Sequence, residues 1–363
     1  MENKHLIAAG HLHVYEGMSR ERVEEIIERI GYLRAAVIGD GCLDVYWDAD
    51  MSLSTLSRET PHYSLPIIGE RVSPGAGGNV AMNLRALGCR EVSFCTATAD
   101  DWRGNLLHRC LEDSGINDSY SLSLKQWVTP AYCKPIRHGL QGVSQEDPRL
   151  DFINRRALSA DEEKQLIAAL DEMMQSADIV AVTDQLPLGI ITEAVRVRLR
   201  FWSARGKKIV VDSRDRIGKF NGVCIKPNEI ESLRALGLDP REGEISWEQL
   251  LNAGKQLQNN NEAPCCMTIG SRGALWFDGG TPVWVPGQPV QPPLDIVGAG
   301  DHFASAFLCA RGAGCSGPES MFFAQLGAAV VIRKLGMTGT ADRREILARY
   351  DEIINGKSES KQQ

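Results

Sequence analysis

The sequence predicts an α/β protein in which helices cover both faces of a mainly parallel central sheet, with a small β flap, or lid, added to it. Two observations support this fold class. Short apolar strands alternate with helical patterns along most of the 363 residues, which is typical of a parallel sheet between two helical layers. Residues 44–75 and 127–153 interrupt the alternation with turn formers and short β patterns, which predict strands outside the main sheet.

The first predicted element is a helix near the N-terminus. Residues 1–18 show no clear pattern, but Ser19 suits an N-cap and Gly31 suits the end of a helix over 20–30. Its apolar residues recur with helical spacing: Val23, Ile26, Ile27 and Ile30. We expect residues 1–31 to form a helical extension that covers the sheet or a neighbouring subunit.

The central sheet is predicted from apolar strands. The first begins at Ala35 and ends at Gly39-Asp40. The other strands fall within 92–101, 178–184, 207–214, 223–229 and 265–273, with helices near 103–114 and 190–205. Ligands bind beyond the carboxyl ends of the strands in such sheets, so the polar residues at those ends are the candidates for a site.

The length allows one large α/β domain or two small ones. We expect one main domain over residues 32–345 that carries the lid segments 44–75 and 127–153. Residues 346–363 are expected to form the end of a helix and a polar tail, because the last segment, NGKSESKQQ, has no apolar pattern.

Composition excludes several classes of partner and location. The net charge of −7 gives no electrostatic reason to expect nucleic acid or an anionic membrane as partner. No apolar run reaches the length of a membrane span, and the N-terminus lacks the pattern of a secretory signal. The ten cysteines form no C-x-x-C pair, which favours buried thiols in a reducing cytoplasm.

The segment from Asp295 to Asp301 carries the strongest chemical signal. Gly298, Ala299 and Gly300 let backbone N–H groups turn inward, and a helix that starts near Asp301 adds unpaired N–H groups and a positive dipole end. Together they would form an anion site beside a carboxylate that the helix terminus keeps ionised. An anion hole beside a carboxylate base suits phosphoryl transfer to an alcohol.

Taken alone, this loop is better explained as a turn followed by a helix cap. Three further motifs change that judgement. A second glycine cluster, SPGAGGNVAMNLRALG over 73–88, opens a helix with Asn79 near its start; KPNEIE holds Asn228 and Glu231 one helical turn apart; and TIGSRG forms a turn over 268–273. Four such pieces in this order on one α/β scaffold are hard to explain as coincidence.

With these motifs in hand, the sequence resembles the ribokinase-type (PfkB) carbohydrate kinases from about Ala35 to Asp342. The motifs that carry the resemblance are the glycine cluster with Asn79, N-x-x-E, T-x-G-x-x-G and D-x-x-G-A-G-D. Within the family the segments GDGCLDVYW, RLDF at 149–152 and VVIRKLGMTGT are most similar to the kinase domain of bacterial heptose-phosphate kinases. The resemblance implies a ribokinase-like three-layer fold, and a cytoplasmic kinase that transfers phosphate from Mg-ATP to a sugar or sugar phosphate.

The resemblance also assigns roles to residues. Asp301 is the general base, and the N–H groups of Gly298, Ala299 and Gly300 form the anion hole. The remaining residues divide among the ligands: Asp44, Gly75 and Asn79 for the sugar, Asn228 and Glu231 for Mg²⁺ and the phosphates through water, Thr268, Gly270, Gly273 and Gln325 for the nucleotide, and Asp295 and Val297 for a monovalent cation such as K⁺. Lys134 and Arg137 in the lid are candidates for an acidic substrate. Family members commonly form homodimers through the lid.

The sequence departs from the family at three points. Ala76 stands where a second glycine is usual, which predicts a stiffer hinge, and Gln325 stands where an asparagine is usual. Heptose-phosphate kinases carry a lysine shortly after S-D-Y, whereas this chain has Asp184 without a lysine in VTDQLPLG. The substrate could therefore be phosphorylated or neutral.

Alternatives remain open at this stage. A catalytically silent sugar or nucleotide sensor would keep the fold but would not need Asp301. A nicotinamide-dependent dehydrogenase is disfavoured because no G-x-G-x-x-G follows the first strand. His302 is expected to be exposed at the start of its helix, whereas Asp212 and Arg214 are as well explained near the phosphates as away from them.

Overall fold

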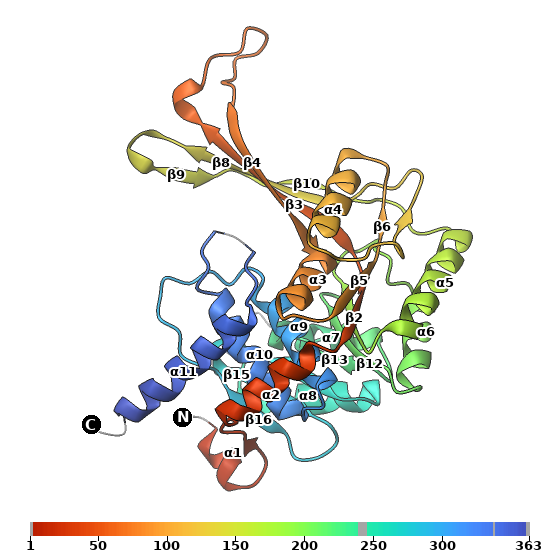
Figure 1. Ribbon diagram of the computed structural model, residues 1–363, viewed down its shortest axis with the longest axis vertical. Coiled ribbons are helices and arrows are strands. Elements are labelled where there is room, and N and C mark those ends of the chain that lie inside the picture. The colour runs from red at the N-terminus through yellow and green to blue at the C-terminus, as the bar shows by residue number, and fades with distance from the viewer. Residues whose placement is uncertain (1–2, 239–244, 337, 361–363) are drawn as a thin grey trace.

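The computed structural model describes residues 3–238, 245–336 and 338–360 (Figure 1). Its central sheet has nine strands. Across the sheet they are β1 His13–Val14, β16 Val283–Pro286, β15 Gly273–Phe277, β14 Cys265–Thr268, β13 Cys224–Ile225, β12 Lys208–Ser213, β11 Ile179–Asp184, β2 Arg34–Gly39 and β5 Glu91–Cys95. Neighbouring strands pair in parallel except at β15, which is antiparallel to both β14 and β16. The prediction of a mainly parallel sheet is confirmed.

Two helical layers cover the sheet, because alternate residues of each strand point to opposite faces. In β2, Ala35 and Val37 enter one core, while Ala36 and Ile38 enter the other. The first core is shared by α2 Arg20–Ile30, α3 Gly77–Ala86, α4 Trp102–Asp113, α9 Ala299–Gly312, α10 Gly317–Val331 and α11 Arg343–Ser360. The second core is shared by α5 Ala160–Ser176, α6 Glu193–Ser203, α7 Glu229–Ala235 and α8 Trp247–Asn261. Within the described ranges, every helix is too short or too polar to span a lipid bilayer.

A second sheet of five strands forms the lid, which projects from the body of the protein (Figure 1). Its strands are β3 Gly41–Asp50, β4 Ile67–Ala76, β8 Ala131–His138, β9 Ser144–Glu146 and β10 Leu150–Phe152. The order is β10-β8-β3-β4, and β9 pairs with β8. Both predicted lid segments therefore belong to one sheet, although β3 begins directly after β2 and not at residue 44. Two further strands, β6 Ala97–Thr98 and β7 Leu122–Ser123, pair with each other beside the body.

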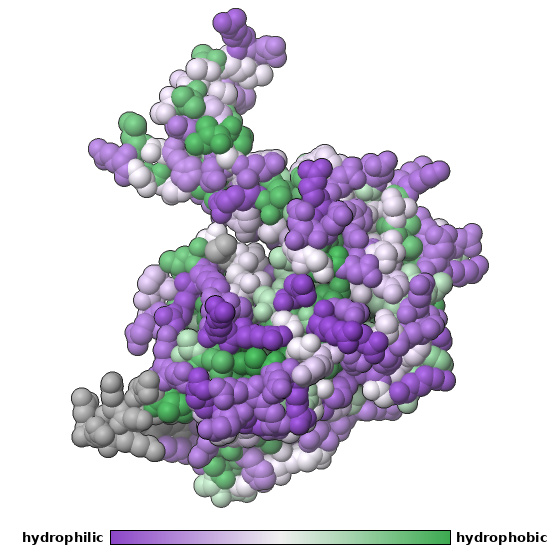
Figure 2. Space-filling view, viewed as in Figure 1, coloured by the Kyte–Doolittle hydropathy of each residue, from purple (hydrophilic) through white to green (hydrophobic). Residues whose placement is uncertain are grey.

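The projecting lid carries apolar residues on its surface. Figure 2 shows hydrophobic patches on this arm of the molecule. The exposed apolar residues of the lid are Leu53, Leu56, Tyr63, Leu65, Ile67, Ile68, Leu140, Val143 and Leu150. A concentration of this kind on a solvated arm is typical of a surface that another protein covers.

The N-terminal extension is part of the main domain's architecture. A short helix, α1 Lys4–Ala8, is followed by β1, which adds an edge strand beside β16. The predicted helix over 20–30 is confirmed as α2, with Ser19 accepting a hydrogen bond from the N–H of Arg22. Residues 1–18 thus contain a strand that their sequence pattern does not reveal.

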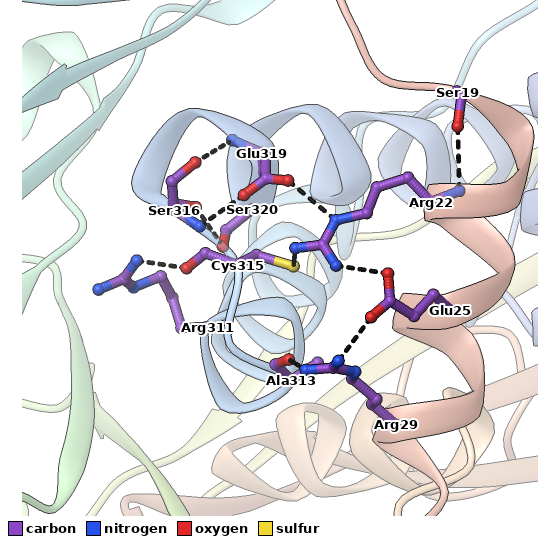
Figure 3. Close-up of polar contacts among 10 residues, drawn as sticks. All are labelled: Ser19, Arg22, Glu25, Arg29, Arg311, Ala313, Cys315, Ser316, Glu319 and Ser320. Carbon is purple, nitrogen blue, oxygen red and sulfur yellow. Dashed lines mark hydrogen bonds and ion pairs between the residues drawn. The ribbon is translucent and has the colours of Figure 1, made fainter.

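Polar contacts hold α2 against the junction of α9 and α10 (Figure 3). The Arg22 guanidinium donates to Glu319 at 2.9 Å and to Glu25 at 2.6 Å. Arg29 donates to the carbonyl oxygen of Ala313 at 3.2 Å. The helix therefore packs on the protein's own helical layer, whereas we expected it to cover the sheet or a neighbouring subunit. The C-terminal helix α11 continues to Ser360, and residues 361–363 of the expected tail lie outside the described residues.

Candidate functional site

The candidate site lies where the carboxyl ends of the parallel strands meet the N-termini of α3 and α9. Asp40 follows β2, Asp184 ends β11, Asp212 lies near the end of β12, and Lys226 follows β13. The lid begins at the same edge, because β3 starts at Gly41. These polar residues lie at the edge of the sheet where we expect a ligand site.

Asp301 lies in the first turn of α9 and is held by Asn79 at the start of α3. The Asn79 amide donates to Oδ2 of Asp301 at 2.6 Å, and the amide of Gln185 is 3.5 Å from Oδ1. The helix turns into this position at Gly298, whose φ of +79° suits glycine. Two of the predicted site residues, Asn79 and Asp301, therefore meet across more than two hundred residues of chain.

The glycine loop keeps two of its three predicted N–H groups free. Among the described residues, no acceptor lies on the N–H of Gly298 or Gly300. The N–H of Ala299 is not free as predicted, because it donates to the carbonyl oxygen of Ile296 at 3.2 Å. The N–H of Asp301 is free in the same sense and adds a donor to the loop. The loop therefore presents Gly298, Gly300 and Asp301 as donors, with Ala299 occupied in its own turn.

Burial sets the acidity of Asp301. It raises the pKa of this carboxyl from 3.8 to about 6, helped by the nearby charge of Asp212 and opposed by Asn79 and Lys226. We expected the helix terminus to favour the ionised form, but the largest effect is burial, which acts in the opposite direction. A carboxylate with a pKa near neutrality is a more effective base than one near 4.

A buried ion pair stands beside Asp301. The ammonium of Lys226 lies 3.1 Å from Oδ2 of Asp212. Burial lowers the pKa of Lys226, but Asp212 and Glu231 outweigh it and raise that pKa above its ordinary value. Asp212 was expected either near the phosphates or away from them. It lies close enough to Asp301 to raise the pKa of that carboxyl. Lys226 is a residue that our sequence reasoning missed, although a lysine directly after an apolar strand is itself a signal.

Asn228 and Glu231 form a reciprocal cap on α7. The N–H of Asn228 donates to Oε2 of Glu231 at 2.8 Å, and the N–H of Glu231 donates to Oδ1 of Asn228 at the same distance. Burial raises the pKa of Glu231 to about 6, while Lys226 opposes the rise. The N-x-x-E motif therefore caps the start of α7. Among the described residues, Oε1 of Glu231 accepts no hydrogen bond and can bind another partner.

The predicted nucleotide residues lie around the end of β14. Thr268 ends the strand, and Gly270 and Gly273 both have positive φ in the turn that follows. Thr268 also forms an isolated bridge with Asn228, which joins this turn to the capped helix. Gln325 lies inside the protein on α10 and donates to the carbonyl oxygen of Val285. Its amide nitrogen is therefore occupied.

The lid face that carries Asp44 also carries Lys134. The ammonium of Lys134 is 3.8 Å from Oδ1 of Asp44 and 2.9 Å from the hydroxyl of Tyr46. Gly75 pairs across the strands with Cys42 and lets Asp44 approach, because a Cβ there would lie 2.7 Å from its Oδ2. Asp44 and Asp301 both act on the buried thiol of Cys42, whose pKa burial raises first. Asp44 and Asp301 therefore border one region.

Arg137 does not join this group. It is three residues from Lys134 on the same strand, so its side chain leaves the opposite face. There it pairs with Asp147 at 2.6 Å. The structure instead brings Arg149 towards Asp44, since Arg149 and Lys134 both lower the pKa of Asp44 against the larger effect of burial.

Asp295 is fixed by the backbone. Its two carboxylate oxygens accept from the N–H groups of Val297 and Gly336, each at 3.0 Å. Val297 is exposed. Both residues lie in the loop that leads to Gly298 and Asp301.

His302 is buried, which corrects the expectation of an exposed side chain. Its exposed fraction is 0%, and its Nδ1 lies 2.7 Å from Oδ1 of Asn83. In VTDQLPLG, the segment without the expected lysine, Asp184 accepts from Ser213 and from the guanidinium of Arg216. Gln185 and Asn83, like Lys226, were not singled out from the sequence.

A family model described as pfkB family carbohydrate kinase matches residues 69–344. The chain belongs to the pfkB carbohydrate kinase family. The enzyme class predicted from the motifs, a sugar kinase, is therefore confirmed.

Curated relatives agree with the family. The Bifunctional protein HldE of Trichlorobacter lovleyi is 28% identical over 341 residues, which cover 91% of this chain and 65% of that protein. The Bifunctional protein HldE of Gluconacetobacter diazotrophicus is 30% identical over 314 residues, which cover 86% of this chain and 62% of that protein. The chain thus spans less than two thirds of the length of either relative.

Solved structures confirm the ribokinase-like fold. The Arabidopsis thaliana ribokinase complexed with ribose and ATP has a TM-score of 0.64 at 19% identity, over 88% of this chain and 98% of that one. The phosphofructokinase-2 of Escherichia coli in complex with potassium has a TM-score of 0.67 at 20% identity, over 88% of this chain and 99% of that one.

Proposed function

We propose that this sugar kinase transfers the γ-phosphate of ATP to a hydroxyl of a phosphorylated sugar, with Asp301 as the general base. The observation that carries the proposal is the pairing of Asp301 with Asn79 beside the free N–H groups of Gly298 and Gly300. The carboxylate and the donors lie on the same first turn of α9, so one helix terminus supplies both the base and the anion hole.

The reaction assigns one task to each part of this turn. Oδ1 of Asp301 accepts the proton of the sugar hydroxyl as its oxygen attacks the γ-phosphorus, and the bond to the bridging oxygen breaks to release ADP. The free N–H groups donate to the transferring phosphoryl group while its charge shifts. Because Oδ2 is engaged by Asn79, the two oxygens of the base have separate roles.

The chain offers residues for Mg²⁺, ATP and a monovalent cation. Mg²⁺ usually takes one or two carboxylates, water and substrate phosphates, and Glu231 fits this pattern because only its Oε2 is used in the cap. When bound, Mg²⁺ would neutralise phosphate charge. We propose that Asn228 orients Glu231 for this contact through water. The remaining assignments follow the family likeness: Thr268, Gly270, Gly273 and Gln325 for the nucleotide, and Asp295 with Val297 for K⁺.

The lid supports an acceptor that already carries a phosphate. Lys134 and Arg149 lie near Asp44 on the face towards the site. Tyr132 pairs with Asp44 across the strands. Burial raises the pKa of Tyr132, and Arg214 from the body of the protein lowers it, so Arg214 also lies near this face. Lys134 already lies near Asp44 and Arg149 already pairs with Asp151, but a sugar phosphate would add an anion to this group of cations, which a neutral sugar cannot do. Asp44 then accepts from the hydroxyls of the same sugar.

The test measures ADP release with Mg-ATP across matched sugars with and without a phosphate, including heptose 7-phosphate, fructose 6-phosphate and ribose. We expect turnover on a sugar phosphate and at least tenfold weaker turnover on its neutral counterpart. Lys134→Met should raise the KM for the phosphorylated sugar, while Arg137→Met, from the opposite face of the same strand, should not. Turnover confined to neutral sugars would refute the phosphorylated acceptor, and an equal effect of both variants would refute the role of Lys134.

A sensor without catalysis is the alternative, and binding of sugar or ATP with no ADP release from any acceptor would favour it. Its weakness is that a sensor has no use for a buried carboxylate held at a pKa near 6. We further propose a homodimer through the exposed apolar residues of the lid. Sedimentation of the wild-type protein and of Ile68→Lys tests it, since a dimer through the lid should dissociate in the variant.

A further inference from the structure

Four side chains from α3 and α9 form a hydrogen-bonded chain that ends on the proposed base. His302 Nδ1 lies 2.7 Å from Oδ1 of Asn83. The Asn83 amide nitrogen lies 2.9 Å from the carbonyl oxygen of Asn79 and 3.3 Å from its Oδ1. The amide nitrogen of Asn79 lies 2.6 Å from Oδ2 of Asp301. Asn79, Asn83 and His302 are all buried, so water does not compete for these bonds.

The direction of every bond in the chain follows from one backbone atom. The carbonyl oxygen of Asn79 can only accept, so the amide nitrogen of Asn83 must face it. Oδ1 of Asn83 therefore faces His302, and His302 must carry its proton on Nδ1. The same amide nitrogen of Asn83 approaches Oδ1 of Asn79, which leaves the amide nitrogen of Asn79 to donate to Asp301.

The surroundings of the other ring nitrogen of His302, Nε2, favour the neutral ring. Among the described residues, no partner lies on its Nε2, which faces Gly327 of α10 so closely that a Cβ there would be 1.9 Å away. Burial, together with the charge of Lys334, lowers the pKa of His302 to about 3. A protonated ring would place an unpaired N–H in this contact, so the ring stays a donor at Nδ1 alone.

We propose that His302 and Asn83 are positioning residues for phosphoryl transfer, which lock the amide of Asn79 with its donor side on Asp301. The proposal rests on the proposed role of Asp301 as base. With the amide locked, Oδ2 of the carboxylate is capped by a donor at 2.6 Å, and Oδ1, which has a longer contact of 3.5 Å with Gln185, accepts the proton of the substrate.

Breaking the chain has a predictable electrostatic consequence. If His302 no longer donates to Oδ1 of Asn83, the contact with the carbonyl oxygen of Asn79 remains as the restraint on the amide of Asn83. That amide can then turn more easily, which lets the amide of Asn79 present its oxygen to the carboxylate. The carboxylate would lose a charge-assisted hydrogen bond, which raises its pKa. The other groups that act on Asp301 are unchanged in this comparison: Asp212, Lys226 and Gln185.

The experiment compares two replacements of the histidine that are similar in size to each other and that both lack the distal atoms of the ring. His302→Asn keeps a side-chain amide nitrogen that can donate to Asn83 as Nδ1 does, whereas His302→Leu has no donor. We expect His302→Leu to shift the acid limb of the pH profile of kcat/KM upward by about one unit, the size of one hydrogen bond to a charged group. Below the limb this is roughly a tenfold loss. His302→Asn should restore the wild-type limb.

Ser305→Ala is the matched control. Ser305 is fully buried on the same helix and donates to the carbonyl oxygens of Asp301 and Val80. Its loss should reduce stability without moving the acid limb. A His302→Leu enzyme that folds and keeps the wild-type limb would overturn the proposal, as would an equal shift in His302→Leu and His302→Asn.

A measurement on the wild-type protein covers the case in which His302→Leu does not fold. Nitrogen-15 NMR of the histidine rings should show one ring that is protonated at Nδ1 and does not titrate between about pH 5 and 8, and its signal should be missing in His302→Asn. A ring at this position protonated at Nε2 would overturn the proposal. If Asp301→Asn retains turnover, the proposed function itself fails; if Asp301→Asn is inactive but the limb ignores His302, only the present inference fails.

Discussion

Replacement of Asp301 by asparagine should separate catalysis from stability. The new amide has the shape of the carboxylate, and its oxygen can accept the hydrogen bond that Asn79 donates to Oδ2 at 2.6 Å. It has no basic oxygen for the substrate proton. A positioned general base contributes about 10²–10⁴ in rate, so we expect turnover to fall at least about a hundredfold.

The same replacement should make the protein more stable above neutral pH. Burial raises the pKa of Asp301 from 3.8 to about 6, so the ionised form is less stable in the folded protein than in the unfolded chain. A shift of about two units corresponds to at most about 3 kcal/mol, and partial solvent access reduces this to about 1–2 kcal/mol. The gain should be present above about pH 6 and vanish below about pH 4, where the carboxyl is protonated in both states.

Two assays decide the matter. ADP release at saturating ATP and acceptor gives the loss of turnover, and the wild-type profile of kcat/KM should rise with pH through about 6 as Asp301 ionises. Urea unfolding at about pH 8 and about pH 4 gives the change in stability. Near-wild-type turnover in Asp301→Asn would refute the assignment of the base. A variant that is less stable at both pH values would refute the reasoning from burial.

Three further predictions follow from single residues. Ala76→Gly should raise the free energy of unfolding by about 1 kcal/mol, measured in urea, because Ala76 has a φ of +48° that glycine adopts without strain; an unchanged or lower value would contradict it. Lys226→Met should lower the free energy of unfolding by about 3 kcal/mol, because Asp212 would remain as a buried charge without its partner; a neutral effect would show that water reaches the pair. Asp118 raises the pKa of His108 through a hydrogen bond that outweighs burial, so the stabilising effect of His108 over His108→Gln should be full below about pH 6 and lost as the pH rises through the folded pKa; a difference independent of pH would contradict it.

The sheet could be predicted because it rests on local patterns. The apolar runs at 178–184 and 207–214 become β11 and β12 with bounds within a residue or two, since strands buried on both faces are apolar throughout. The edge strand β1 could not be predicted in the same way. Its two residues, His13 and Val14, have no pattern of their own, and they are a strand only because β16 offers them a free edge.

The position of Asp301, the proposed base, could be predicted because its motif is contiguous, whereas its environment is not. The positions of Gly298, Gly300 and Asp301 follow from one loop, but the rise in the pKa of Asp301 depends on burial and on Asp212, which lies elsewhere in the chain. The burial of His302 depends likewise on the packing of α9 against α10. Helical spacing in α9 does not reveal it, because that helix is buried on nearly every side.

In the lid, the spacing of residues along a strand decides which cation shares a face with Asp44. Lys134 and Arg137 are both cations of one predicted β segment, and charge alone makes them equal candidates for an acidic substrate. In a strand, however, a separation of three residues reverses the face. Lys134 therefore lies on the same face of the lid as Asp44, which belongs to the neighbouring strand β3. Arg137 pairs with Asp147 on the other face. Because β8 is a regular strand, Lys134 and Arg137 point to opposite faces and cannot belong to one site. The test of the acceptor is therefore whether Lys134→Met or Arg137→Met changes the KM for the sugar phosphate.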